Sequence, residues 1–443
     1  MKNKRKEPVN NNPAYSTQLL KAIRKFLPKR GLSLIEDDRR VRWTDRMLVI
    51  TAILMAWTDS TMLKDAFALA RDFVIRMYPT RRRPGRQFRG FLVALDKNHN
   101  RLLKCIRTSL QSVLCQKWML RIQHRGWVVM GVDGTRISVP RTVANEQGFG
   151  VFGKNKSLPQ QQLTTVFHVD TQLPWTWRRS RGDISERTHF SEMISELPSH
   201  TLLLADAGFT GYAMMRKLQN AGHDFIIRVG SNVNLLRKLG FTVREYDGIV
   251  YLWPKKHRKS EPLVLRLVTV IDGSKRVDLL TSVLDDNLLS DAEIAKLYRR
   301  RWGVEVMYRS LKQTMEKDKL RSRVPRHGQM ELDWLMIGFW LLGLMTLDAS
   351  GASRTVCRDR SWSPARALRI VRQCMSLSRQ KTRKLSNVLA GALQDTCKRS
   401  GPKRTRQYAE KKREKPPGKP KIRIAERSEV IAAQKFKSAK IAS

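Results

Sequence analysis

Short apolar runs, each followed at once by an aspartate, mark the middle of the chain. Residues 127–132 form one such run and precede Asp133, and residues 200–205 form another and precede Asp206. Continuous apolar runs of this length are typical of strands that are buried on both faces. The pattern therefore predicts two buried strands, each of which delivers an acidic side chain at its end.

Segments with helical spacing alternate with these runs. The expected helices are 183–197 and 210–220, and the further expected strands are 163–169, 175–178 and 225–229. An alternation of strands and helices predicts an α/β sheet with its functional residues at strand ends. Between 241 and 283 the pattern is mostly of strand type, which indicates a β-rich insertion of about 232–287. Ser290 and Glu293 have capping-box spacing, so a new helix is expected to begin there.

Both ends of the chain differ from this middle part. Residues 1–122 have helical spacing and are rich in Arg and Lys, which favours a helical DNA-binding region, and 351–397 is also expected to be helical. Residues 398–443 are basic, with interspersed Pro and Gly, and are expected to be a disordered tail that binds DNA or simply aids solubility. The apolar stretch 334–347 is shorter than the roughly 20 residues of a spanning helix and predicts a buried core helix.

Net charge narrows the class of partner. The chain holds 86 Lys and Arg against 39 Asp and Glu, a formal net charge of +47. Such an excess favours a polyanion, usually nucleic acid. The alternative is a membrane-surface protein, for which neither a basic amphipathic helix nor a lipidation motif was found. Five cysteines without a Cys-x-x-Cys pair favour reduced thiols, and the first residues do not resemble a signal peptide, so a cytoplasmic location is expected.

One helical segment carries a regular set of polar side chains. Tyr298, Arg301, Glu305 and Lys312 fall within roughly one-sixth of the circumference of an ideal α-helix. A carboxylate on this face can hold a metal ion, and the cations beside it can hold phosphate. Gly303 lies inside the segment and could kink the helix.

Three acidic residues therefore stand out: Asp133, Asp206 and Glu305. Hard Mg²⁺ ions prefer carboxylate oxygen, and two such ions can activate an attacking oxygen and stabilise a leaving oxygen at a phosphodiester. Asp-Gly is also a common turn, and an aspartate at a strand end is a common cap, so neither aspartate alone identifies such a site.

The chain resembles a known family at these positions, the DDE-type insertion-sequence transposases of the insertion-sequence-four family. Their Tyr-x2-Arg-x3-Glu-x6-Lys motif is matched by Tyr298, Arg301, Glu305 and Lys312. Val-Asp133-Gly-Thr and Ala-Asp206-Ala-Gly-Phe resemble the two aspartate motifs. The resemblance covers about 125–350 and implies a ribonuclease-H-like catalytic domain at 123–350, interrupted by the β-rich insertion.

The resemblance implies a cut-and-paste DNA transposase. Asp133, Asp206 and Glu305 would bind two Mg²⁺ ions, for which Mn²⁺ may substitute, while Arg301, Lys312 and Tyr298 would hold phosphates at the cut end. The implied partners are double-stranded DNA, as terminal inverted repeats and target, and a second copy of the chain in a paired-end complex. A hairpin intermediate is expected from relatives.

Two tryptophans bear on that intermediate. In hairpin-forming relatives a flipped base stacks on a tryptophan of the β insertion, and Trp253 is the candidate, although a small-core role is the simpler interpretation. Trp302 is expected to pack in the core. Two other functions stay open: a catalytically silent, domesticated DNA-binding regulator, and another ribonuclease-H-like nuclease. The presence of all three acids favours the active transposase.

Overall fold

The structure is a computed structural model of the whole chain. It describes residues 14–28, 32, 42–77, 83–152, 158–242, 246, 248–272, 275–351, 361–376, 384–393 and 418–441. Contacts divide the chain into two compact units. Unit 1 comprises Met1–Trp118, Ile137–Gln161 and Tyr308–Asp395, and unit 2 comprises Met119–Arg136, Gln162–Met307 and Thr396–Ser443.

Unit 1 is built almost entirely of helices. They are α1 (Ala14–Phe26), α2 (Asp45–Trp57), α3 (Leu63–Met77), α4 (Phe88–Leu114), α5 (Val143–Phe149), the π-helical η5 (Ser310–Thr314), α10 (Pro325–Ala349), α12 (Pro364–Met375) and α13 (Leu385–Ala390). The π-helical η1 (Cys115–Met119) lies at the boundary with unit 2. The expected helical regions 1–122 and 351–397 thus share one unit, and that unit also takes in α10 from the stretch expected to be catalytic.

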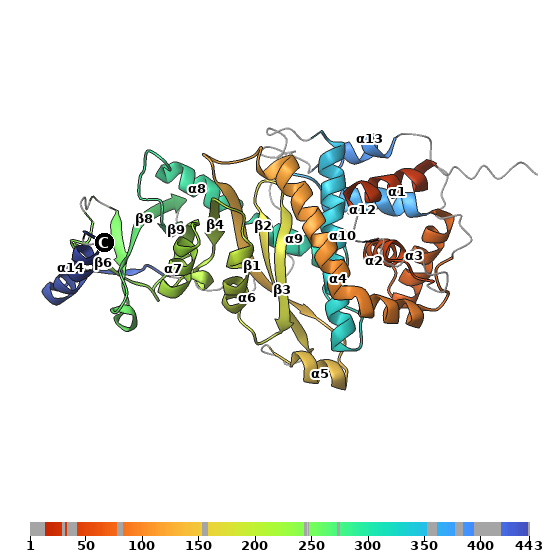
Figure 1. Ribbon diagram of the computed structural model, residues 1–443, viewed down its shortest axis with the longest axis horizontal. Helices are drawn as coiled ribbons and strands as arrows, with labels where there is room; N and C mark the ends of the chain where they lie inside the picture. Colours follow the sequence, from red (N-terminus) through yellow and green to blue (C-terminus); the bar gives the residue numbers. More distant parts are fainter. Residues whose placement is uncertain are drawn as a thin grey trace, which may run out of the picture. The chain divides into compact units, whose positions relative to one another are not determined.

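Helix α10 forms the centre of unit 1, where α1, α2, α4, α5, α12 and α13 pack around it (Figure 1). Its length and composition would allow it to cross a membrane, but 94% of its most apolar window is buried within the protein. A helix that is apolar all round belongs in a core, which confirms the prediction for 334–347. Gly338 of α10 lets this helix approach α2 closely, since an added Cβ would lie 3.1 Å from the Cβ of Ala56 on α2.

Unit 2 contains the sheet, apart from the ends of β1 and β2. Its strands are β1 (Val128–Ser138), β2 (Gln160–His168), β3 (Leu173–Arg181), β4 (Thr201–Ala205), β5 (Asp224–Val229), β6 (Asn234–Arg237), β7 (Ile249–Leu252), β8 (Leu263–Asp272), β9 (Lys275–Thr281) and β10 (Lys421–Ile424). Their order is β10-β6-β7-β8-β9-β5-β4-β1-β2-β3. This mixed α/β architecture confirms the predicted class at that level.

Helices and short turns connect these strands. They are α6 (Glu186–Met193), η2 (Ile194–Glu196), η3 (Ala207–Phe209), α7 (Tyr212–Asn220), η4 (Lys255–His257), α8 (Asp291–Arg300), α9 (Gly303–Arg309) and α14 (Arg427–Ile441). The expected capping box is present, because the Ser290 hydroxyl accepts from the Glu293 backbone NH while the Glu293 carboxylate accepts from that of Ser290. Because β9 pairs antiparallel with β5, the β-rich insertion continues the central sheet.

The strand that carries Asp133 is longer than expected. It was predicted to end at Asp133, but β1 runs on to Ser138. The reason lies in its two neighbours, since β1 has β4 on one side and β2 on the other. Pairing with β4 is recorded only from Val128 to Gly131, so Asp133 lies beyond the part of β1 that β4 covers.

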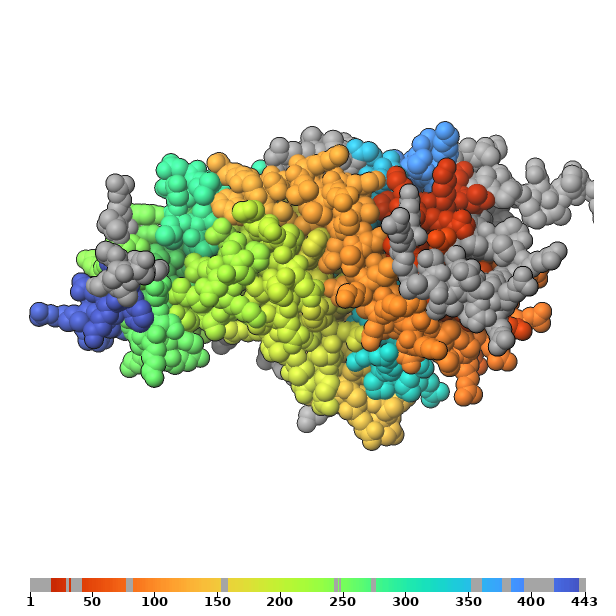
Figure 2. Space-filling model, viewed as in Figure 1, coloured from red at the N-terminus to blue at the C-terminus, as the bar shows by residue number. Residues whose placement is uncertain are grey.

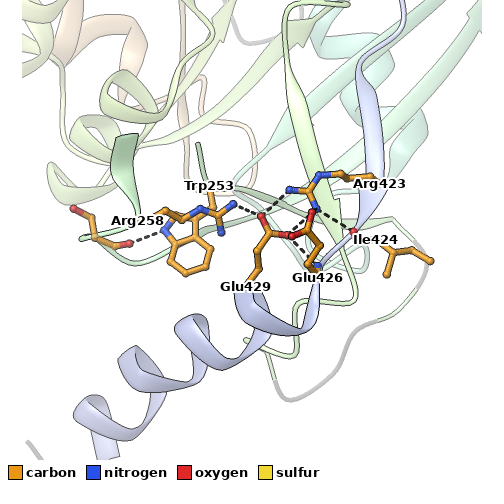
Figure 3. A network of polar contacts seen from close by, with 7 residues as sticks. Trp253, Arg258, Arg423, Ile424, Glu426 and Glu429 are labelled. Atoms are coloured by element: carbon orange, nitrogen blue, oxygen red, sulfur yellow. Dashed lines mark hydrogen bonds and ion pairs between the residues drawn. The ribbon is translucent and has the colours of Figure 1, made fainter. Parts of the chain in front are cut away.

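The C-terminal segment also differs from its expectation. Residues 398–417 lie outside the described residues, but within the expected disordered tail β10 pairs parallel with β6 and α14 follows it. The Glu429 carboxylate on α14 accepts hydrogen bonds from Arg423 and Arg258, and from the Glu426 backbone NH at 3.0 Å (Figure 3). Backbone pairing and a buried carboxylate give this basic segment the attachment that its composition alone did not indicate.

We predict that this attachment depends on pH. The hydrogen bond from Arg423 is the largest of the effects that lower the pKa of Glu429, from 4.5 to about 2. A carboxyl group with a depressed folded pKa contributes stability above its unfolded pKa and loses that contribution as pH falls through the folded value. Hydrogen exchange in α14, corrected for intrinsic rates, should therefore accelerate as pH falls from about 4.5 to 2.

Glu429→Gln should produce the same acceleration at neutral pH, with a loss of about 1–3 kcal/mol in local stability, because hydrogen bonds to a charged carboxylate are lost. Glu426→Gln is the matched control, since the Glu426 side chain is 71% exposed and makes one ion pair at 3.5 Å. Equal exchange in both variants would contradict the role assigned to Glu429.

Candidate active site

The two strand-borne aspartates come level with each other at one edge of the parallel strands. Gly131 of β1 pairs with Leu204 of β4, and counting two residues along each strand brings Asp133 opposite Asp206. Neighbouring strands lie about 4.8 Å apart, so the parallel register places these two carboxylates close together. Asp133 Oδ1 accepts the Gly134 backbone NH at 2.8 Å, and Asp206 caps η3 by accepting from the Ala207 backbone NH.

Burial sets the electrostatics of Asp133. It is the main reason that the pKa of Asp133 is raised to about 7; the charges of Glu186 and Glu305 also act to raise it, whereas the Gly134 backbone NH and Arg301 act to lower it. A carboxyl that lies among other carboxyls and away from water resists ionisation. These mutual effects show that the acids from β1, α6 and α9 form one electrostatic cluster within unit 2.

Glu186 is a fourth carboxylate of this cluster, and the sequence analysis did not single it out. It is the first residue of α6, which the Ser185 hydroxyl caps. A Cβ on Gly134 would lie 2.3 Å from Glu186 Oε2, and one on Gly208 would lie 2.8 Å from Oε1. The Glu186 carboxylate therefore lies against the backbone that follows each aspartate. Burial and the charge of Asp206 raise its pKa.

The helix that carries Glu305 is interrupted. One continuous helical face was expected from Tyr298 to Lys312, but α8 ends at Arg300 and α9 begins at Gly303. Arg301 and Glu305 nevertheless keep their helical relation, because Arg301 Nη2 lies 3.2 Å from Glu305 Oε1. The motif therefore spans three elements, because Tyr298 lies on α8, Glu305 on α9 and Lys312 on η5.

Arg301 is the central cation of the cluster. It is 8% exposed, and its Nε and Nη1 have no hydrogen-bond partner in the described part of the chain. Burial lowers its pKa, but the charges around it, among them those of Asp133 and Asp206, outweigh burial and raise the pKa. A buried guanidinium with donors to spare can bind a further anion, such as a phosphate oxygen.

Tyr298 lies beside this arginine. The Arg301 guanidinium is 5.6 Å from the centre of the Tyr298 ring, within the range of a cation–π contact. The Tyr298 hydroxyl is buried and has no hydrogen-bond partner among the described residues, and burial raises its pKa to about 12. It is therefore protonated and can donate a hydrogen bond at neutral pH.

The donor set suits a hard divalent cation. In the described part of the chain, no three Asp, Glu, His or Cys side chains are already arranged as a metal site. The chemistry of the cluster fits all the same, because its donors are carboxylate oxygens, and burial raises the pKa of Asp133 to about 7, so that the charges of the acids are compensated only in part. The Arg301–Glu305 ion pair now supplies part of that compensation.

The remaining residues that the sequence singled out belong to other elements. Lys312 belongs to η5 in unit 1, where burial lowers its pKa. Trp253 is 2% exposed, Arg258 lies over its ring at 4.2 Å, and Phe436 of α14 meets it edge-on at 6.2 Å. Trp302, expected in the core, is instead 54% exposed, because it lies in the turn between α8 and α9.

Comparison with known proteins bears on the family of the region that holds this cluster. The model of the transposase DDE domain family matches residues 128–340. The chain is 27% identical over 252 residues to the transposase InsG for insertion sequence element IS4 of Escherichia coli K12. This match covers 51% of this chain and 54% of that protein. It is 22% identical over 227 residues to a putative transposase for insertion sequence element IS4SA of Synechocystis, covering 49% and 60% respectively.

The chain thus spans little more than half the length of the curated relatives that it matches. Among solved structures, it is similar to a piggyBac transposase in a synaptic complex with hairpin DNA, with a TM-score of 0.39 and 13% identity over 90% of this chain and 89% of that one. Residues 128–340 match the DDE domain, and the curated matches lie in the same group as the resemblance seen in the sequence. We conclude that residues 128–340 are a transposase DDE domain and that the chain is similar to transposases of the insertion-sequence-four group, as the resemblance in the sequence predicted.

Proposed function

We propose that the chain cuts DNA at the ends of an insertion sequence and joins the freed 3′ ends to target DNA. The observation that carries the proposal is the gathering of Asp133, Asp206 and Glu305 around the buried Arg301. We also propose that the strands β3-β2-β1-β4-β5 are a ribonuclease-H-like core, in which β1 and β4 present the two aspartates. Terminal inverted repeats, target DNA and a homodimer that pairs two ends follow from the same proposal, as does a cytoplasmic, nucleoid-associated location.

Each residue of the cluster has a proposed role. Asp133, Asp206 and Glu305 would hold two Mg²⁺ or Mn²⁺ ions, with Glu186 as a fourth acid that supports the aspartates. The ions would supply Lewis-acid stabilisation of charge at the phosphodiester. Arg301 would bind a phosphate oxygen through its spare donors, and Tyr298 would donate a hydrogen bond to one. We assign Lys312 a phosphate contact from unit 1 by its place in the motif alone.

The two alternative functions differ from the proposed one in what they require of the acidic residues. A silent DNA-binding regulator would not need the acids, yet four carboxylates are kept together at a cost, as the raised pKa values of Asp133 and Glu186 indicate. Carboxylates held in this way are better explained by a cation that they bind. Another ribonuclease-H-like nuclease would cut DNA but would not join the 3′ end to a target.

The first prediction concerns catalysis. With Mg²⁺ and a DNA that carries the element's own ends, wild type should release those ends and join them to target DNA. Glu305→Ala should lower the rate by at least about 10³-fold, because a metal ligand and its charge compensation are lost. Gel separation of cut and joined products measures both steps. Strand transfer by Glu305→Ala at the wild-type rate would refute the assignment.

Glu186→Gln tests the fourth acid in the same assay. It should lower the rate by about 10–100-fold, as expected for a group that orients metal ligands. Glu192→Gln on the same helix is the matched control, because its side chain is 59% exposed. If the two variants have equal rates, Glu186 has no part in the site.

The second prediction uses stability as a readout that does not depend on activity. In EDTA at pH 8, Asp133→Asn should raise the melting temperature, because an ionised carboxylate with a pKa of about 7 in the fold is replaced by a neutral amide. Mn²⁺ should raise the melting temperature of wild type but not that of the variant. Asp286→Asn, at an exposed position, should behave as wild type in both conditions. An unchanged Mn²⁺ response in Asp133→Asn would contradict metal binding at this carboxylate.

The third prediction concerns the hairpin. We propose that a base flipped at the cut stacks on Trp253, which requires Arg258 to leave the indole face that it covers at 4.2 Å. Trp302, at 54% exposure, can meet a base without rearrangement. Loss of a stacking aromatic costs about 1–3 kcal/mol, so Trp253→Ala should slow hairpin formation more than nicking. Slower hairpin formation in Trp302→Ala alone would transfer the role to Trp302.

A further inference from the structure

The C-terminal segment completes the β-rich insertion. Strand β10 lies at the edge of the sheet beside β6, with the Lys421 backbone NH donating to Val233 O at 2.9 Å and that of Ala425 to Arg237 O at 2.8 Å. Helix α14, dark blue in Figure 2, lies against the insertion, which is green. Residues far apart in the sequence are therefore joined in one surface of unit 2.

One carboxylate holds two arginines of this surface in place. Glu429 binds Arg258, from the loop after β7, and Arg423, from β10 (Figure 3). Arg258 in turn covers the ring of Trp253, whose indole NH donates to Ser260 O at 2.7 Å. The position of β10 is thus fixed by side chains as well as by its backbone pairing.

A cavity of about 730 Å³ opens between these elements. Its cations come from three separate parts of the chain: Arg187, Lys255, Lys256, Arg258, Lys421 and Arg423. No acidic side chain of the described residues lines it. Of the six cations, only Arg258 and Arg423 have an ion-pair partner within the described chain.

The remaining lining is aromatic and polar. Trp253 lines the cavity, and Tyr212 stacks on His257 with their ring centres 4.4 Å apart. Six like charges in one cavity repel one another, and a ligand with several negative charges relieves that repulsion. A DNA backbone supplies regularly spaced charges, and its counterions are released when lysines neutralise its phosphates.

We propose that this cavity binds the phosphate backbone of DNA and that the C-terminal segment is a working part of it. Strand β10 brings Lys421 and Arg423 to the cavity, and α14 fixes the strand through Glu429. This inference rests on the proposed action on DNA and adds a cavity that none of the four clustered acids lines, although Arg187 in its lining directly follows Glu186, and to which no role was assigned.

The test compares variants of equal charge. Lys256→Ala/Lys421→Ala removes two positive charges from the cavity, whereas Lys435→Ala/Lys437→Ala removes two from α14 at positions that do not line it. Binding to a labelled random-sequence duplex is measured by fluorescence anisotropy across a salt series. The plot of log K for DNA binding against log salt concentration has a negative slope. The cavity variant should reduce the magnitude of this slope by about two, and the control should leave it near the wild-type value.

Glu429→Ala gives a second comparison, in which charge and structure predict opposite results. It makes the protein more positive, so charge alone predicts tighter DNA binding. The inference predicts weaker binding, because Arg423 and β10 lose their anchor. Glu426→Ala, which makes the same change of charge at an exposed side chain, should not weaken binding. Thermal unfolding of each variant verifies that it is folded.

Equal slopes for the two lysine pairs, or tighter binding by Glu429→Ala, would overturn the inference. Catalysis does not enter this assay. A wild type that binds DNA through the cavity but neither cuts nor joins it would instead overturn the proposed function and leave the cavity assignment intact.

Discussion

The parallel register between β1 and β4 is the constraint on which the site depends. Gly131 and Leu204 are paired, and this pairing brings Asp133 and Asp206 level although 73 residues separate them in the sequence. A slip of one residue would turn one carboxylate to the opposite face of the sheet. Register is secured here by burial, since every residue of β4 and the first five residues of β1 are buried. The apolar core of unit 2 is thus what positions its most polar residues.

Two glycines and one arginine allow the acidic side chains to lie close together. Gly134 and Gly208 leave room for Glu186, because a side chain at either position would meet its carboxylate. Arg301 offsets part of the repulsion among the acids, yet Asp133 keeps a pKa of about 7. The cluster is therefore only partly compensated by the protein itself. A site of this kind gains stability from any cation that reaches it, and that couples its folding to its chemistry.

The strands and the motif residues of this site could be predicted from the sequence. Apolar runs located β1, β4 and their aspartates, and motif spacing located Arg301 and Glu305, because these features depend on neighbours along the chain. Glu186 was missed because it enters the site only through the turn from β3 into α6, although a capping serine followed by an acid at a helix start was a usable signal. The pairing of β10 with β6 was not predicted, because the alternation in Lys421–Ile424 is only four residues long and lies in a basic segment. The helical regions 1–122 and 351–397 were expected separately and pack together because α10 offers apolar surface all round.

The four clustered acids and the cations that line the cavity are different residues of unit 2, and this division has a physical consequence. The acidic cluster contributes four carboxylates against the single buried Arg301, so on its own it repels a phosphodiester at neutral or higher pH. Affinity for DNA must then come from elsewhere, and the cavity between the insertion and β10 is lined by six Lys and Arg side chains. Neutralising a backbone with the cations of the cavity, rather than with cations among the acids, lets the cluster stay poor in cations until a metal ion arrives. Binding and chemistry can then be tuned by different residues, with the sheet as their common rigid support.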